Sequence, residues 1–334
     1  MKRVSIKDIA QKVGVSNATV SLVLNGKEKQ GRVSKDMAER IRQVVREMHY
    51  QPNRLARSLQ SGKSQTIGLL VADISNPFFG TLAFYVQNEL EKAGYAVIIM
   101  NTNESDTQMG KMIELLRSRQ VDGFIIVPTE FGEEYIRQLL EANLPLVLVD
   151  RCYPDMETAN VLIDNYQATR EATRLLLDKG CKRIALLIYD NSQPHMAERK
   201  RGYVETLTQA KVYDKNLIKA VNYRTLEEDI QYAVTCLVKQ EKDVDGILFA
   251  TNTIAIMGIK SLLNMRIRIP DEIRIVCFDK SDAFDFMPVA IPYIHQPIAN
   301  MGRKAVEILL EEIENKANKA VNCQLYASLI QPME

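Results

Sequence analysis

Six short side chains near the N-terminus have types that suit the edges of DNA bases: Ser16, Asn17, Ala18, Thr19, Ser21 and Leu22. An asparagine can hydrogen-bond to an adenine edge or another base in the major groove, and an alanine methyl can contact the methyl of thymine. Nearby basic side chains suit phosphate contacts: Lys2, Arg3, Lys7, Arg32 and Lys35. The alternative is that Asn17 and Thr19 only cap a helix or face solvent.

Three short helices are predicted to position these side chains. The first has its apolar residues on one face, at Ile6, Ile9, Ala10 and Val13. Ser5 is the expected N-cap of this helix, and Gly14 breaks the pattern with a turn that requires a positive φ.

The second and third helices complete a helix-turn-helix unit. Ser16 can cap a second helix that runs to about Asn25, and Val20 has the spacing to pack it against Ala10. A third helix opens at Ser34, with its inward side chains at Met37, Ile41, Val44, Val45 and Met48. In such a unit the second helix lies in the major groove.

The charge of the chain is unevenly divided. The 334 residues carry 43 basic and 42 acidic side chains, a net charge of +1. Residues 1–63 hold 14 basic and 5 acidic side chains, a net charge of +9, which leaves −8 for the remainder. A basic arm on an acidic body indicates nucleic-acid binding by one module, whereas the alternative is an unevenly charged solvated surface.

No motif indicates an enzyme, a metal site or a membrane segment. The sequence lacks HExxH, GxSxG and GxGxxG, and Gly62-Lys63-Ser64 lacks the upstream glycine of a phosphate loop, since position 57 is arginine. Five cysteines and three histidines are scattered without a CxxC pair, which predicts no disulfide framework, metal or cofactor. Without a signal peptide or an apolar run of ~18 residues, we expect a protein of the reducing cytoplasm.

Three segments carry a resemblance to a known family: VSIKDIAQKVGVSNATVSLVLNG, YQPNRLARSL and TIGLLVADISNPFF. The chain resembles the lactose-repressor/galactose-repressor family of bacterial transcription regulators over essentially its whole length. The resemblance implies a hinge helix that orders in the minor groove, with Asn53, Ala56 and Arg57 facing DNA and Leu59 inserted at the central base step. The alternative for Leu59 is packing within an ordinary linker.

The expected DNA contacts combine the helix-turn-helix with this hinge: Ser5, Lys7, Ser16, Asn17, Ala18, Thr19, Ser21, Leu22, Asn25, Tyr50, Asn53, Ala56, Arg57 and Leu59. Leu22 departs from the family pattern, because many members carry a polar or basic base-reading residue there. The polar stretch 26–31 is somewhat long, which predicts an extended turn before the third helix.

Residues 66–334 alternate short apolar runs with amphipathic stretches, the pattern of doubly wound parallel sheets. In the first half the expected strands are 67–71, 96–100, 123–127 and 146–149, with helices over 79–92 and 108–119. In the second half the expected strands are 183–188, 217–221, 245–250 and 274–278. Two such halves predict two lobes with a cleft at the carboxyl ends of the strands.

The expected fold class is an N-terminal all-α helix-turn-helix domain with a hinge helix, followed by an α/β bilobed body with two parallel-sheet subdomains. The resemblance makes this body periplasmic-binding-protein-like. The expected domains are 1–50 for DNA binding, 51–65 for the hinge and linker, and 66–334 for effector binding and dimerisation. The first lobe is expected to hold 66–163 and 296–321, and the second 164–295 and 322–334, with crossings near 162–166, 293–296 and 321–323.

The resemblance also implies that the lobes close on a small effector, commonly a sugar or nucleobase. It places six residues in the cleft: Phe78, Phe79, Asp150, Arg199, Asn252 and Asp279. Aromatic faces stack on sugar rings, and aspartate, asparagine and arginine bind hydroxyls. In the alternative reading the phenylalanines are core residues, the aspartates cap helices, the arginine belongs to a solvated run and the asparagine lies in a turn.

Two departures and one lysine bear on this cleft. Thr253 stands where an acidic residue is usual, and Cys277 stands where a glycine is usual. Both predict an unusual cleft geometry, and Lys280 beside Asp279 would favour an anionic ligand.

The sequence therefore predicts a regulator, most simply a repressor, that binds a palindromic operator as a homodimer under the control of an effector such as a sugar or related metabolite. Dimers of this family pair their first lobes, so residues 79–90 are the expected interface. No leucine heptads follow the core, which predicts a dimer rather than a tetramer. The alternatives are a solute-binding protein without a role at DNA, and an α/β enzyme with a regulatory arm.

Overall fold

The computed structural model describes residues 4–50, 63–241, 243–315 and 320–331 of a chain that divides into two compact units, Met1–Ser64 and Gln65–Glu334. The hinge contacts expected at Asn53, Ala56, Arg57 and Leu59 lie outside the described residues, as do Lys2 and Arg3.

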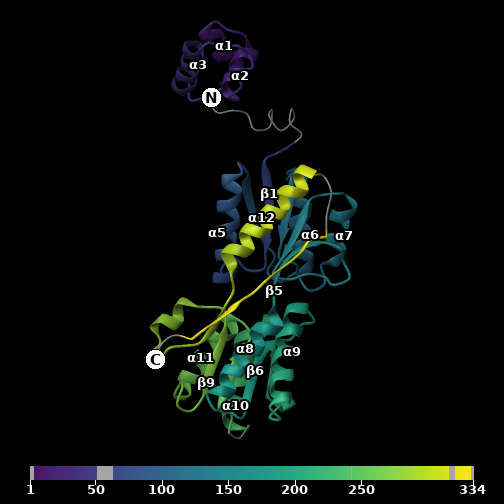
Figure 1. Ribbon diagram of the computed structural model, residues 1–334, viewed down its shortest axis with the longest axis vertical. Helices are drawn as coiled ribbons and strands as arrows, with labels where there is room; N and C mark the ends of the chain where they lie inside the picture. Colours follow the sequence, from purple (N-terminus) through teal and green to yellow (C-terminus); the bar gives the residue numbers. More distant parts are fainter. Residues whose placement is uncertain (1–3, 51–62, 242, 316–319, 332–334) are drawn as a thin grey trace. The chain divides into compact units, whose positions relative to one another are not determined.

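The small unit contains three helices: α1 (Ile6–Val13), α2 (Asn17–Leu24) and α3 (Lys35–Glu47) (Figure 1). Each begins at a predicted N-cap, where Ser5, Ser16 and Ser34 accept a hydrogen bond from the backbone three residues on. Gly14 ends α1 with φ of 81°, which an L-residue rarely adopts. The predicted helix-turn-helix is confirmed.

The core of this unit lies where the three helices meet. Its fully buried centre is formed by Ile9, Val20 and Ile41, one from each helix. Arg42 forms an ion pair with Glu28 at 2.5 Å, which fastens the long turn between α2 and α3 to the third helix. The extended turn predicted over 26–31 is therefore present.

The first sheet of the large unit has the strand order β11-β5-β4-β3-β1-β2. Its strands are β1 (Thr66–Val71), β2 (Ala96–Asn101), β3 (Gly123–Ile126), β4 (Leu146–Val149), β5 (Ala159–Ile163) and β11 (Asn322–Leu325). Helices α5 (Pro77–Lys92) and α12 (Ile298–Asn315) cover one face, and α6 (Asp106–Ser118) and α7 (Glu133–Glu141) cover the other. All of its strand pairs are parallel.

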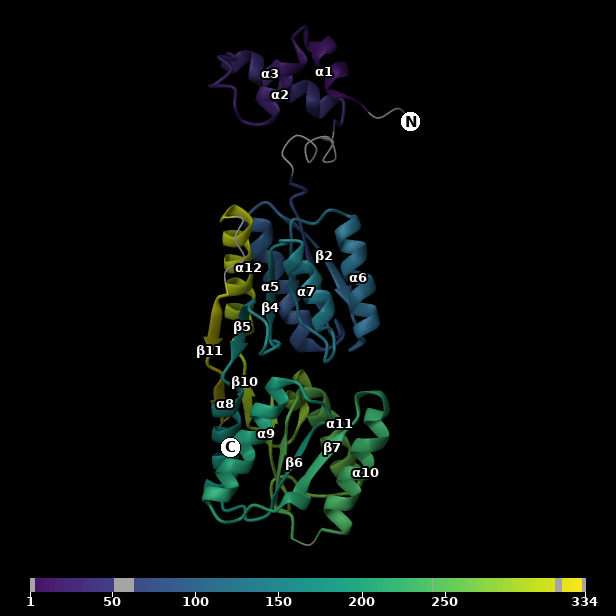
Figure 2. The same cartoon turned by 90° about the vertical axis from the view of Figure 1, so that its right-hand side faces the viewer.

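The second sheet has the order β12-β10-β9-β8-β6-β7. Its strands are β6 (Ile184–Tyr189), β7 (Ile218–Val221), β8 (Gly246–Phe249), β9 (Arg274–Phe278), β10 (Tyr293–His295) and β12 (Ser328–Ile330). Figure 2 shows α8 (Asn165–Asp178) and α9 (Pro194–Gln209) on one side of it, with α10 (Leu226–Lys239) and α11 (Asn252–Asn264) on the other. Only the β10–β12 pair is antiparallel among the described strand pairs.

The eight strands predicted from apolar runs are all present, because apolar runs covered by helices on both faces are the mark of parallel sheets. The strands β5, β10, β11 and β12 were not predicted as strands, and β5, β10 and β11 overlap segments that were expected only as crossings between the lobes. β11 and β12 are edge strands of the two sheets, and β5 and β10 pair next to them.

One expected lobe boundary is wrong. Residues 322–325 were assigned to the second lobe, but β11 pairs in parallel with β5 in the first sheet. The chain passes to the second sheet only after Leu325, where β12 pairs with β10. The cause is that a four-residue strand has too weak an apolar pattern to reveal its pairing partner.

No helix in the described part of the chain is long and apolar enough to cross a membrane.

Candidate functional site

A cavity of about 400 Å³ lies in the large unit, where the carboxyl ends of the strands in the two sheets face each other. All six residues predicted for the cleft line it: Phe78, Phe79, Asp150, Arg199, Asn252 and Asp279. Five of them lie between the end of a strand and the first turn of the next helix, which is where a doubly wound sheet places ligand-contacting side chains, whereas Arg199 lies farther along α9.

Phe78 and Phe79 open α5, which begins just after β1. Their rings meet edge to face with centroids 5.0 Å apart, and each side chain is 6% exposed. Both belong to the main hydrophobic core and both line the cavity, so the two readings from the sequence hold together.

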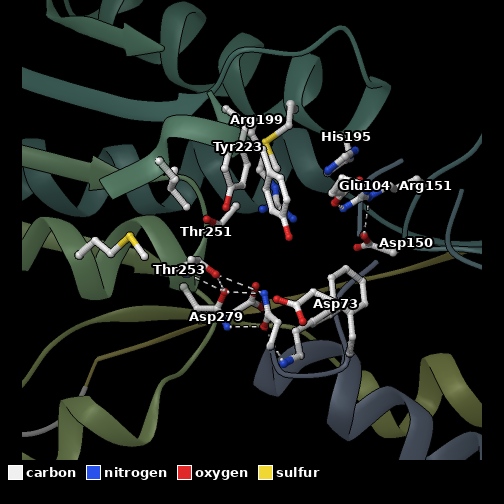
Figure 3. A pocket seen from close by; sticks show the side chains of 18 of the residues that line it. Asp73, Glu104, Asp150, Arg151, His195, Arg199, Tyr223, Thr251, Thr253 and Asp279 are labelled. Atoms are coloured by element: carbon white, nitrogen blue, oxygen red, sulfur yellow. Dashed lines mark hydrogen bonds and ion pairs between the residues drawn. The ribbon is translucent and has the colours of Figure 1, made fainter. Parts of the chain in front are cut away.

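Asp150 and Arg151 follow β4 in a turn where Asp150 has a φ of 69°. Asp150 caps no helix, and its Oδ2 accepts a hydrogen bond of 3.3 Å from Nε of Arg151. Burial raises the pKa of Asp150, and the positive charges of Arg151 and Arg199 oppose this rise. Figure 3 shows this pair on one wall of the cavity, beside Glu104.

Arg199 projects from α9 and is 3% exposed, so it does not belong to a solvated run. Its Nε donates to Asn165 Oδ1 at 2.8 Å, its Nη1 donates to the Ala250 carbonyl at 2.6 Å, and its guanidinium lies 3.5 Å from the centroid of the Phe278 ring. Burial lowers the pKa of Arg199 to about 10.

Gly202 allows α9 to bring Arg199 to this position. A Cβ at Gly202 would lie 2.5 Å from the Tyr166 carbonyl oxygen on α8. The close approach of the two helices therefore requires glycine one turn after Arg199.

Asp279 follows β9 with a φ of 67° and accepts a hydrogen bond of 2.8 Å from Gln296. Burial raises its pKa to about 6, although the charge of Arg199 and this hydrogen bond lower it. The N-cap of the short helix that follows is Ser281, so the capping interpretation of Asp279 is wrong.

Asn252 lies at the start of α11, and its side chain is 2% exposed. It donates to Asn76 Oδ1 at 2.9 Å, and Asn76 Nδ2 is 3.3 Å from both Asn252 Oδ1 and Thr253 Oγ1. These bonds join the two lobes directly. Thr253, a departure from the family pattern, therefore takes part in a contact across the cleft.

Two expectations about the cleft are not met. Cys277 is fully buried in the core of the second lobe and is not among the lining residues, because it alternates with Phe278 along β9. Lys280 is exposed, forms an ion pair of 2.9 Å with Asp285 and is also absent from the lining. Neither residue shapes the cavity.

Several lining residues carried no signal in the sequence. His195 is 5% exposed, and its Nδ1 has no hydrogen-bond partner among the described residues. Burial and the nearby charges of Arg151 and Arg199 hold its pKa well below the ordinary value, which keeps the imidazole neutral. Its place one helical turn before Arg199 on α9 was the only pointer to it.

The small unit presents a second candidate surface along α2. Ser16, Asn17 and Ala18 are exposed, and Thr19, Ser21 and Leu22 are partly buried. Ser16 Oγ accepts from the Thr19 amide at 3.1 Å and is 2.9 Å from its hydroxyl, so both hydroxyls also serve the start of the helix.

The remaining predicted contacts of this unit are divided between surface and packing. Ser5, Lys7 and Asn25 are exposed. Tyr50 packs on the core of the unit. Leu22 packs against Gly31 so closely that a Cβ atom at position 31 would lie 2.3 Å from Cδ1 of Leu22. Leu22 therefore has a packing role that explains an apolar residue at this position.

Among the described residues, no group of three or more His, Cys, Asp and Glu side chains is arranged to hold a metal ion.

A helix-turn-helix unit, followed in the chain by two parallel-sheet lobes with a polar cavity at their strand ends, defines a DNA-binding regulator of the ligand-responsive class. Residues 5–53 match the model of bacterial regulatory proteins of the lacI family, and residues 64–331 match that of the periplasmic binding proteins and sugar binding domain of the same family. The chain belongs to the LacI family. It is a transcriptional regulator and not an enzyme.

Relatives agree with this assignment over nearly the whole chain. The ribose operon repressor of Halalkalibacterium halodurans is 33% identical over 93% of this chain and 91% of its own length. The repressor PurR of Vibrio atlanticus is 29% identical over 98% of this chain and 97% of its own. The lac repressor dimer bound to operator and the anti-inducer ONPF shares the fold, with a TM-score of 0.86 at 20% identity over 99% of this chain and 98% of that one.

Proposed function

We propose that this regulator is a repressor that binds a palindromic operator as a homodimer and responds to a small sugar bound in the cavity between its lobes. The observation that carries the proposal is the set of six predicted residues that line one cavity, in a chain that also carries a helix-turn-helix. Such a protein acts on the chromosome and therefore in the bacterial cytoplasm.

The chemistry of the cavity suits a polyol. Phe78 and Phe79 offer apolar faces to a sugar ring. Asp150 and Asp279 each have one carboxylate oxygen with no hydrogen-bond partner among the described residues. A carboxylate oxygen can accept a hydrogen bond from a hydroxyl group of a bound sugar. The volume of about 400 Å³ is that of a small-molecule site.

Ribose is the first sugar to test. The relative in Halalkalibacterium halodurans is a ribose operon repressor. A LacI family regulator from Enterococcus faecium, 24% identical with a TM-score of 0.71 over 80% of this chain and 97% of that one, was solved with bound ribose.

DNA recognition is proposed for α2. Asn17 and Ala18 would read base edges, with Ser16, Thr19, Ser21 and Leu22 beside them. The phosphate backbone of the DNA would be contacted by Ser5, Lys7, Asn25 and Tyr50. The hinge contacts expected in residues 53–59 would be made in the minor groove.

The dimer is proposed to form through the outer face of α5. Five of the twelve residues in 79–90 are buried in their own lobe, whereas Phe84 is 59% exposed and Tyr85 lies edge to face against it at 5.4 Å. An exposed phenylalanine beside a partly buried tyrosine on the outer face of a helix favours an interface.

Effector control is proposed to work through closure of the lobes. A ligand that contacts both lobes favours the closed arrangement by its differential affinity, and the dimer transmits this to the DNA-binding units. Induction and co-repression differ only in which arrangement binds DNA better.

The test is selection of DNA from a random library with the full-length protein, followed by binding to the selected site with and without D-ribose. We expect a palindromic site and at least a tenfold change in affinity with D-ribose. Binding to DNA without sequence preference would refute the proposal of a specific operator. An unchanged DNA affinity in the presence of D-ribose and of other sugars would refute the proposal of a sugar effector.

A further inference from the structure

We infer that Glu104 makes the cavity select uncharged ligands over anionic ones, because it holds and neutralises the guanidinium of Arg151. This inference deepens the proposed function and rests on the cavity being the effector site.

Hydrogen bonds within the protein engage most of the N–H groups of Arg151. Its Nη1 and Nη2 each donate to one oxygen of Glu104 at 2.7 Å, the two-pronged arrangement that matches a carboxylate. Its Nε donates to Asp150 at 3.3 Å, and Nη1 also reaches the Pro128 carbonyl at 3.4 Å. Of five N–H groups, one remains for a ligand.

The balance of charge in the cavity is acidic. Five lining side chains are carboxylates, namely Asp73, Glu104, Asp150, Glu227 and Asp279, whereas three are arginines, Arg151, Arg199 and Arg224. The unpaired oxygens of Asp150 and Asp279 can accept hydrogen bonds from O–H donors, which a polyol provides and an ion such as sulfate does not. An anion would also meet their repulsion.

Glu104 is the carboxylate that neutralises Arg151 most directly, at the wall where the two side chains meet. Asp150 and Asp279 point to the ligand space and are needed for hydroxyls, whereas both oxygens of Glu104 are engaged by Arg151. Figure 3 shows Glu104 and Arg151 together on the same wall as His195. Without the Glu104 charge, Arg151 would keep only the longer carboxylate contact of 3.3 Å with Asp150, and its two Nη groups would become available beside Arg199. Two neighbouring guanidinium groups with free N–H donors attract sulfate, phosphate and carboxylate groups.

The test uses sulfate as the anion probe and D-ribose as the uncharged probe, on the full-length protein at constant ionic strength set with chloride. In the wild type, sulfate should raise the melting temperature only by its general effect as an ion excluded from protein surfaces, and it should not weaken D-ribose binding. In Glu104→Gln, sulfate should raise the melting temperature by more than it does in the wild type, and it should weaken D-ribose binding at least tenfold at concentrations that leave wild-type binding unchanged.

Two further variants separate charge from folding. Glu104→Asp keeps the negative charge and should still reject sulfate. Glu104→Gln combined with Arg151→Gln removes the unpaired cation, which is costly to bury, and should lose the sulfate response that the single variant gains. Glu133→Gln, an exposed residue outside the cavity, is the matched control.

The outcomes distinguish this inference from the proposed function. Equal sulfate sensitivity in the wild type and in Glu104→Gln would overturn the role of Glu104. If no variant binds D-ribose, the sugar assignment fails, yet the sulfate shift of the melting temperature still decides the role of Glu104.

Discussion

Two carboxyl groups of the cavity, Asp150 and Asp279, are buried, which destabilises their charged form in the absence of a ligand. Asp279 is a buried carboxyl whose pKa is raised to about 6 although Arg199 lies close enough to lower it. Asp150 is raised in the same direction by burial. Such groups are a feature of binding sites, where the ligand supplies the interactions that the folded protein lacks.

Asp279→Asn should therefore stabilise the protein and weaken binding of the effector. The raised pKa means that the folded state holds this proton more tightly than the unfolded state, so the free energy of unfolding falls as pH rises from about 4 through 6. At pH 8 the variant should gain about 1–3 kcal/mol, because two pKa units correspond to roughly 3 kcal/mol. Thermal melting of both proteins from pH 4.5 to pH 8 measures this gain.

The pH dependence makes that prediction specific. The gain should shrink below pH 6, where the wild-type carboxyl of Asp279 becomes protonated. A lower melting temperature for Asp279→Asn at pH 8 would contradict the prediction.

At the scale of the element, α2 combines stability with recognition. Its start depends on the Ser16 cap, and Asn17 is exposed without a hydrogen bond to any described residue. Substitutions at Ser16 and at Asn17 therefore test the capping role and the DNA-binding role of α2 separately.

Ser16→Ala should lower the stability of the small unit by about 1 kcal/mol, since the Thr19 amide loses its acceptor. Hydrogen exchange of the α2 amides in the full-length protein measures this. An unchanged exchange rate would show that the cap contributes nothing.

Asn17→Ala should leave the stability of the unit intact and weaken binding to the selected DNA site by about 5- to 150-fold, the range of one lost base contact at 1–3 kcal/mol. Competition with single-base variants of the site should locate the affected base pair. Gln11→Ala, exposed on α1, is the control, and equal losses for both variants would refute base reading by Asn17.

At the scale of the whole large unit, contacts of the chain itself hold the lobes together. Beside the Asn76–Asn252 contact, Glu130 Oε1 accepts from the backbone N–H and the hydroxyl of Ser192 at 2.6 and 2.8 Å. Gln193 donates to the Pro128 carbonyl at 3.3 Å. Neither Glu130 nor Ser192 lines the cavity, so closure can be tested without altering it.

Glu130→Ala should shift the ligand-free protein toward an open arrangement. Loss of these bonds at a solvated edge is worth about 1 kcal/mol, so we expect D-ribose to bind roughly fivefold more weakly. Small-angle scattering should show a larger radius of gyration without ligand, whereas the exposed Glu133→Ala should match the wild type. Identical scattering and affinity in Glu130→Ala would show that the contact does not govern closure.

The dimer provides a second prediction at this scale. Phe84→Glu should raise the dimer dissociation constant at least tenfold, because a charge would be buried where an exposed aromatic side chain is proposed to pack. Sedimentation measures the change. Tyr232→Glu, at another strongly exposed aromatic residue on α10, should leave the dimer intact, and similar behaviour of the two variants would place the interface elsewhere.

The sequence alone determined the elements and the main cleft residues. Apolar period and caps predicted the three helices of the small unit and eight strands of the large one, because those signals are local to each segment. The six cleft residues came with the family resemblance, and all six line one cavity.

The tertiary structure alone decided how these elements meet. The pairing of β11 with β5, the Glu104–Arg151 pair and the Asn76–Asn252 contact join residues far apart in the chain. Cys277 and Phe278 are neighbours in sequence, yet strand alternation buries them in different hydrophobic clusters, and it is Phe278 that lies against Arg199. Non-local pairings of this kind leave no periodic trace, because they depend on which strand ends the fold brings together.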